Sequence, residues 1–170
     1  MQYTEGTIGR VFILRLEDGE VLNDTIEAFA RDHEVDRALV TYVGGSADGS
    51  RVVVGPEATD SAAGSRETAD QDAASRNTAD PEPVVPIVHR LSGHREVLAL
   101  GTLVPNQAGE PTLHMHAATG REGDATVGCT RAGLEVWLVG EVVIEEILGA
   151  TARRVVDPAT GFALLQVGEE

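Results

Sequence analysis

The chain has 170 residues, of which 42% are hydrophobic and 4% aromatic, so a core of aliphatic side chains can form without help from a disulfide or a metal ion. Acidic residues number 28 against 13 basic ones, and the formal charge of −15 argues against a simple nucleic-acid binder and against an anionic membrane as partner. A single Cys excludes an internal disulfide, and the lack of a signal-like start or an apolar run of about 18 residues predicts a cytoplasmic protein with no membrane partner.

The basic residues have an unusual composition, because all 13 are Arg and none is Lys. In molar salt, carboxylates retain water and ions, and a Debye length of about 3 Å screens their mutual repulsion. We therefore expect a halophilic protein. The alternative is an ordinary acidic protein from a GC-rich genome, in which Arg codons are favoured over Lys codons.

The first part of the chain predicts strands around one helix. Residues 9–17 alternate as a strand does, and because both faces are mostly apolar we expect this strand to be central in its sheet. Between residues 20 and 33 the apolar positions recur at i, i+4, i+7 and i+8, which predicts an amphipathic helix. Further strands are expected at 38–43 and 51–55. The apolar stripe of the helix consists of Leu22, Ile26, Phe29 and Ala30.

Residues 56–86 differ from the rest of the chain. They are rich in Ala, Asp, Glu, Ser, Thr and Arg, contain no aromatic residue, and repeat a short pattern, with residues 65–70 resembling residues 75–80. Such a composition buries too little apolar area to offset the entropy lost on ordering. We expect an acidic low-complexity insert that is disordered on the surface, with a short Ala-rich helix as the alternative.

After residue 86, strands follow one another, separated by polar or Gly-rich turns. One helix followed by many strands predicts an α+β fold with a mostly antiparallel sheet, in a single domain spanning residues 1–170. The expected strands are 87–91, 96–104, 112–118, 125–129, 134–148, 153–156 and 162–167.

The pair His114 and His116 is the most distinctive local feature. In a strand, residues i and i+2 point to the same face, so both imidazoles would converge on one spot. Two neutral imidazoles suit Zn²⁺ if a third ligand comes from a neighbouring strand. We expect the hairpin that follows to turn near residues 121–122. Cys129 and Thr130 would then lie across from His114, which makes Cys129 a candidate thiolate ligand. The alternatives are two half-buried histidines bonded to backbone or water, and a Cys that only packs.

The remaining histidines have simpler explanations. His33 ends the predicted helix, where a cation suits the helix dipole. His89 and His94 flank a turn as surface residues, although either could complete a site across a subunit boundary. The sequence has no phosphate-binding Gly-Lys-Ser/Thr motif, no dinucleotide-binding Gly pattern and no serine-hydrolase elbow, and nothing near Cys129 marks it as a nucleophile. No catalytic or cofactor-binding residue is therefore predicted.

Several segments together resemble the plant- and prokaryote-conserved (PPC) domain, and they cover the chain outside residues 56–86. These segments are 9–20 with the helix that follows, 38–45, 96–103, 109–116, 127–144 and 157–165. The resemblance implies a twisted, mostly antiparallel sheet with one main helix packed on it, a fold similar to that of acetolactate decarboxylase, assembled as a homotrimer. It also implies a stand-alone prokaryotic member, which the acidic composition would make haloarchaeal.

The same resemblance bears on the candidate site. Prokaryotic members often carry His-x-His on one strand and Gly-Gly-His on the next, and acetolactate decarboxylase uses a three-histidine metal site. Here His114 and His116 match the first motif. The second motif reads Gly-Cys-Thr, with Thr130 at the place of the third histidine. Cys129, or a histidine such as His89, would have to replace it.

Two functions follow as hypotheses. The first is a trimeric assembly or interaction module, DNA-binding or regulatory by resemblance, although the Arg-Gly-Arg-Pro core of plant AT-hooks is missing and the charge opposes contact with DNA. The second is a protein that binds a metal such as Zn²⁺, or another small ligand, around His114 and His116, with or without enzymatic activity.

Overall fold

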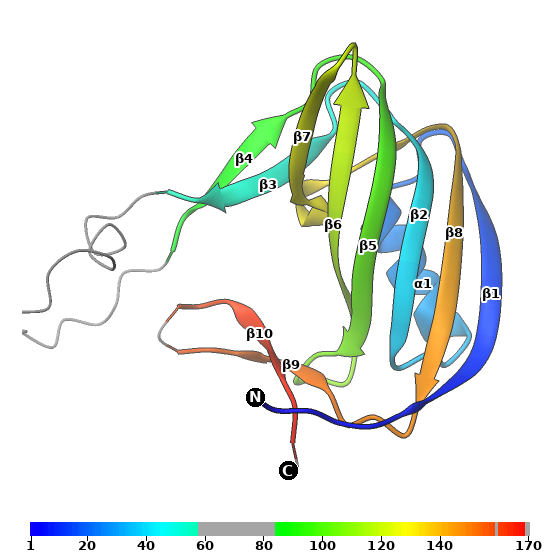
Figure 1. The fold of residues 1–170 in the computed structure, drawn as a ribbon, viewed down its shortest axis with the longest axis vertical. Helices are drawn as coiled ribbons and strands as arrows, with labels where there is room; N and C mark the ends of the chain where they lie inside the picture. Colours follow the sequence, from blue (N-terminus) through cyan, green and yellow to red (C-terminus); the bar gives the residue numbers. More distant parts are fainter. Residues whose placement is uncertain (58–83, 159, 169–170) are drawn as a thin grey trace, which may run out of the picture.

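The computed structural model describes residues 1–57, 84–158 and 160–168. In this part of the chain, no helix combines the length and the apolar character required to cross a lipid bilayer. The elements in chain order (Figure 1) are β1 (Thr7–Glu17), α1 (Leu22–Asp32), β2 (Ala38–Ser46), β3 (Arg51–Pro56), β4 (Pro86–Arg90), β5 (Arg95–Pro105), β6 (Pro111–Arg121), β7 (Asp124–Cys129), the 3-10 turn η1 (Thr130–Ala132), β8 (Val136–Leu148), β9 (Arg153–Val156) and β10 (Ala163–Gln166).

Eight of these strands form one antiparallel sheet in the order β1-β8-β2-β5-β6-β7-β3-β4, and β9 and β10 form a separate hairpin. The helix α1 lies against one face of the sheet, behind β2 and β8 in Figure 1. The predicted α+β fold with a mostly antiparallel sheet is therefore confirmed. The prediction that residues 9–17 form a central strand is wrong, because β1 is the outermost strand of the described sheet and lies beside β8.

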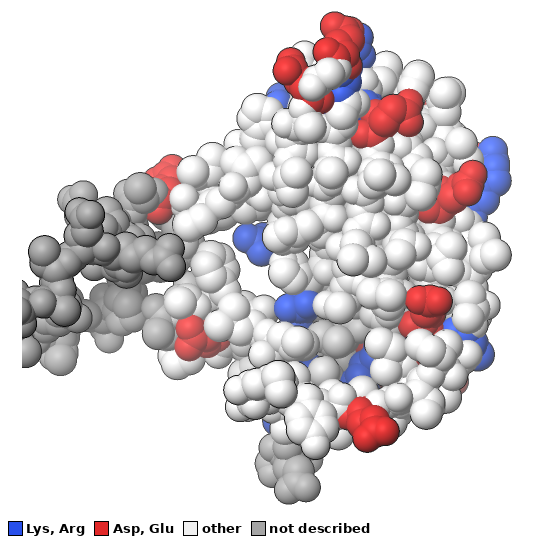
Figure 2. Space-filling view, in the orientation of Figure 1, with Lys and Arg blue, Asp and Glu red and all other residues white. Residues whose placement is uncertain are grey.

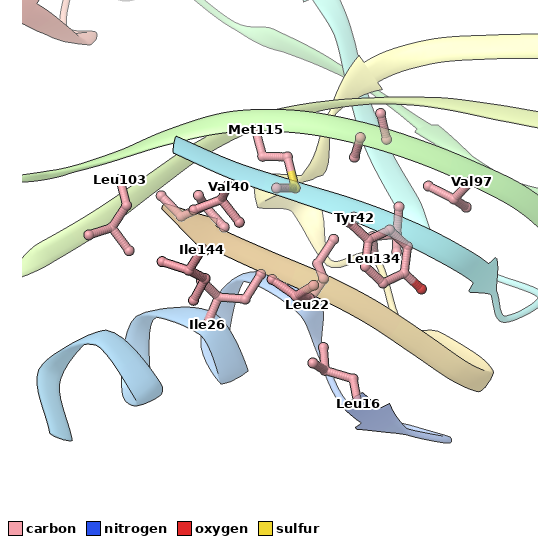
Figure 3. Packing of buried hydrophobic residues seen from close by; sticks show 14 of the residues in the cluster. Leu16, Leu22, Ile26, Val40, Tyr42, Val97, Leu103, Met115, Leu134 and Ile144 are labelled. Carbon is pink, nitrogen blue, oxygen red and sulfur yellow. The ribbon is translucent and has the colours of Figure 1, made fainter. Parts of the chain in front are cut away.

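The helix packs on the sheet through the stripe that the sequence predicted. Leu22 and Ile26 are fully buried and meet Val40 of β2 and Ile144 of β8 (Figure 3). Met115 of β6 points into the same core. Each such side chain contributes on the order of 1.5–3 kcal/mol when it is removed from water. This core holds β6, the strand that carries both candidate histidines, in a fixed position relative to α1.

The other face of the sheet is largely apolar, and the β9–β10 hairpin contacts it at β5. Ile13 is 81% exposed, Leu98 66%, Leu100 57% and Val127 62%. Val43 joins this surface, because it lies directly opposite Leu98 across β2 and β5. Figure 2 views this face, which is white in the middle and charged around its rim. We call the surface formed by these five residues the open sheet face. Its apolar pattern explains why β1 resembles a central strand in sequence.

Most elements lie where the sequence predicts them, with small differences at their ends. β8 begins at Val136 instead of two residues earlier, because Leu134 is buried in the preceding turn, where its carbonyl accepts the N–H of Leu22 at 2.9 Å. The predicted low-complexity insert falls almost entirely outside the described residues. The strands that flank it, β3 and β4, pair with each other at Pro56 and Pro86.

Candidate functional site

Strand β6 presents two histidines on the side of the sheet away from α1. His114 and His116 point outward because the intervening Met115 points into the core, where it is fully buried. Their Nε2 atoms lie 3.2 Å apart, and their rings are perpendicular, with centroids separated by 4.9 Å. Both imidazoles therefore present a nitrogen to the same small volume.

Strand β7 brings Cys129 to this volume. Cys129 is 3% exposed and lies directly opposite His116 in the β6–β7 hairpin. The expected position opposite His114 is wrong, because the turn consists of Glu122 and Gly123, both with positive φ, one residue later than expected. Moving the turn by one residue moves the pairing by two, which keeps each side chain on its face of the sheet. The donor atoms of the two histidines and the cysteine consequently all lie within 4.8 Å of one another.

Thr130, which the resemblance places where relatives carry a third histidine, faces the core instead. It is fully buried, and its hydroxyl oxygen lies 2.6 Å from Oδ1 of Asn23 and 3.2 Å from the carbonyl oxygen of Met115. The Nδ2 of Asn23 in turn donates to the carbonyl of Leu113 at 3.2 Å. These bonds tie the first turn of α1 to β6 and to the end of β7. Cys129, and not Thr130, therefore faces the histidine pair.

The other histidines discussed above lie apart from this pair. His89 is on β4, the edge strand two places beyond β7 in the sheet order, and it is not part of the cluster. The ring of His94 stacks on that of Trp137, with centroids 4.4 Å apart. His33 follows α1, and its Nδ1 lies 3.0 Å from the carbonyl oxygen of Phe29. The prediction that His33 caps the helix is confirmed.

Burial, together with the charges around the cluster, keeps one imidazole neutral. Burial lowers the pKa of His114 to about 4, and the positive charges of Arg154, His116 and Arg131 act in the same direction. At neutral pH this ring is uncharged, which is the form that binds metals. Burial also lowers the pKa of the Arg154 guanidinium, while the neighbouring Cys129 partly opposes that shift. A thiolate at Cys129 would therefore have a cation beside it.

A pocket of about 670 Å³ opens beside the two histidines. Helix α1 contributes Asp24 and Glu27 to its wall, and the β9–β10 hairpin and the turn within it contribute Arg154 and Phe162. Arg154 also reaches β5, where its Nη2 donates to Oγ1 of Thr102 at 3.1 Å. No sequence motif marks Arg154 as part of a site, because its approach to β5 and β6 exists only in three dimensions.

Comparison with solved structures finds the same fold in other organisms. A plant- and prokaryote-conserved protein from Pyrococcus horikoshii has a TM-score of 0.73 and 20% identity, with 100% of both chains covered. A metal-containing protein from Archaeoglobus fulgidus has a TM-score of 0.72 and 21% identity, covering 98% of this chain and 99% of that one. A predicted DNA-binding protein from Ralstonia eutropha JMP134 has a TM-score of 0.61 and 17% identity, covering 92% and 90%.

At these identities the structural likeness establishes the fold alone. Among curated proteins, none matches the chain closely enough to count as a relative. The family model of the Plants and Prokaryotes Conserved domain matches residues 3–148, which include every strand of the large sheet together with α1, both histidines and Cys129. The chain therefore belongs to the Plants and Prokaryotes Conserved domain family, the PPC family that its motifs resemble.

Proposed function

We propose that this protein binds a zinc ion through His114, His116 and Cys129, and that it does so as a homotrimer. The observation that carries the metal proposal is the convergence of the three donor atoms within 4.8 Å of one another. In a tetrahedral site with Zn–N distances of about 2.0–2.1 Å, two ligand nitrogens lie about 3.3 Å apart, close to the 3.2 Å between the two Nε2 atoms. The sulfur would have to approach by roughly 1 Å, a side-chain adjustment.

The ligand set favours a site that is open to a further ligand. Three protein ligands leave one position of a tetrahedral zinc ion free, as in zinc sites that bind substrates, whereas structural sites use four. At the free position the ion would supply Lewis acidity to a bound water or small ligand. The chain itself supplies a neutral imidazole at His114 and a pocket of about 670 Å³ next to it. The metal-containing protein from Archaeoglobus fulgidus shares this fold, which further supports the proposal.

The open sheet face supports the assembly part of the proposal. Contiguous apolar surfaces of this kind are rare on monomers and mark interaction sites. A second copy of the chain is the favoured partner, because a chain with a formal charge of −15 would repel itself anywhere except through a face with few charges in its middle. Leu100 of this face lies directly opposite His116, so the metal site borders the proposed subunit contact.

Light scattering after size-exclusion chromatography, in concentrated salt, tests the assembly. We expect a trimer for the native chain and a smaller species for Leu98→Glu, because the new carboxylates would be buried without partners. Val156→Glu serves as the control, since Val156 is 53% exposed on β9, away from the open sheet face. A native protein that elutes as a monomer would contradict the assembly part of the proposal.

DNA binding, which the resemblance implies, is not part of this proposal. The formal charge of −15 repels phosphates, and the open sheet face carries few charges of either sign. A salt titration of binding to duplex DNA tests the point. We expect no binding even at low salt, measured while circular dichroism shows that the protein stays folded.

Metal analysis of protein purified without an affinity tag tests the zinc site. We expect about one zinc ion per chain, retained through a metal-free wash. His114→Ala should lose most of this metal. His33→Ala is the matched control and should keep it, because His33 caps α1 away from the cluster. A metal content near zero, or one that His114→Ala leaves unchanged, would contradict the proposal.

A further inference from the structure

The β9–β10 hairpin adds a buried cation to the candidate site. The hairpin lies beyond residues 3–148, the part of the chain that the family model matches. Its Arg154 is 6% exposed, and one guanidinium nitrogen donates to Thr102 of β5. The Nε of Arg154 is buried and has no hydrogen-bond partner among the described residues. A guanidinium held in this way has unused donor capacity.

Within the described residues, no carboxylate is bound to Arg154. It forms no ion pair with any residue in the described ranges. Burying a charge without a counter-charge is costly, and proteins normally offset the cost with an ion pair, a metal or a ligand. A zinc ion with one thiolate ligand would add a net positive charge beside Arg154, and Arg131 lines the same pocket. An anion bound beside Arg154 would offset this charge.

The pocket combines charged and apolar lining residues. Leu113 of β6 and Leu165 of β10 line it with apolar surface. Phe162 lines it too, and the guanidinium carbon of Arg131 lies over the Phe162 ring, 5.7 Å from the ring centroid. Its acidic residues belong to α1, where Glu27 already accepts the N–H of Leu113 at 2.8 Å. The anionic end of a ligand is thus favoured at the hairpin side of the pocket and disfavoured at the helix side.

We propose that this pocket binds a small organic carboxylate with an apolar tail, with its carboxylate on Arg154 and its tail against Leu113 and Leu165. This inference rests on the proposed function for the position of the ligand, which would lie next to the open position of the zinc ion. Inorganic phosphate carries a negative charge as the carboxylate does but has no apolar tail, so it serves as the comparison ligand. The hairpin would then act as the part of this protein that selects the ligand.

Isothermal titration calorimetry at constant salt tests the inference, with 4-methylpentanoate as the probe and the full chain in zinc-loaded and chelator-treated forms. We expect 4-methylpentanoate to bind, and its neutral amide and inorganic phosphate to bind at least about tenfold more weakly. Arg154→Gln should weaken binding of the carboxylate by about tenfold or more. Arg154→Lys should weaken it less, because it keeps the charge and loses the planar fork. Arg153→Gln, which changes the neighbouring residue on β9, should bind like the native chain.

Two results would overturn the inference: no binding of 4-methylpentanoate to folded, zinc-loaded native protein, or equal binding by the native chain and both Arg154 variants. Phosphate that binds as tightly as 4-methylpentanoate would overturn the choice of a carboxylate with an apolar tail. The zinc content of the same samples separates the two proposals. Zinc without carboxylate binding removes this inference alone, whereas Arg154-dependent binding in protein that takes up no zinc removes the zinc site alone.

Discussion

Replacing Thr130 by Val should destabilise the protein through one buried hydrogen-bonded link. Val keeps the shape of Thr and replaces its hydroxyl by a methyl group, so Oδ1 of Asn23 loses the donor that lies 2.6 Å away. Asn23 is 8% exposed, and water cannot easily take over this bond. A buried acceptor left without its partner costs about 1–3 kcal/mol. For a chain of this length, a loss of about 2 kcal/mol corresponds to a fall in Tm of roughly 4–8 °C.

Thermal unfolding followed by circular dichroism measures this effect, at one protein concentration because an oligomer's Tm depends on concentration. Thr130→Ser is the control, since it keeps the hydroxyl and loses one methyl group, at a cost of about 1 kcal/mol or less. The link is also tested by adding Asn23→Ala to Thr130→Val, which should cost less than Asn23→Ala alone. A Thr130→Val protein that unfolds at the native temperature would refute this role of the hydroxyl.

Three further variants test the core and one ion pair. The Arg10 guanidinium holds the pKa of Glu146 at about 2, so the Glu146 carboxylate stabilises the fold above its ordinary pKa of 4.5 and loses that effect as pH falls toward 2. Glu146→Gln should therefore lower Tm at pH 7, and the difference in Tm from the native protein should disappear between pH 4.5 and 2, whereas a difference that does not change with pH would contradict the ion pair. Leu103→Ala removes a fully buried side chain and should cost about 2–5 kcal/mol in urea unfolding, whereas less than about 1 kcal/mol would mean that the site is not packed as described. Gly140→Ala would place a methyl group 2.5 Å from the ring of Tyr42 and should cost about 1–3 kcal/mol, an effect that a native-like unfolding curve would rule out.

The elements could be predicted from the sequence because local periodicity reflects local burial. Leu22 and Ile26 recur at helical spacing and both pack on the sheet. The position of β1 could not be predicted in the same way. Residues such as Ile13, 81% exposed, make the strand apolar on both faces, and a pattern of this kind does not distinguish a second layer of the same chain from a face left open.

The candidate site could be predicted in part. Alternation along a strand is enough to place His114 and His116 on one face. Which of the two lies opposite Cys129 depends on the turn between β6 and β7. The positive φ values of Glu122 and Gly123 fix a turn that pairs Cys129 with His116, two residues from the expected partner His114. Arg154 could not be found, because it comes from a separate hairpin whose docking on the sheet leaves no periodic signal in the sequence.

Absorption spectroscopy of the cobalt-substituted protein tests the joint role of His114, His116 and Cys129 most directly. Cobalt(II) adopts zinc sites and reports on its ligands, since a bound thiolate adds a charge-transfer band to the visible bands of a tetrahedral ion. We predict both features in the native protein. Cys129→Ser should lose the charge-transfer band, and His116→Ala should lose both. Cobalt that binds without a thiolate band, or folded native protein that binds no cobalt, would contradict the proposed metal site.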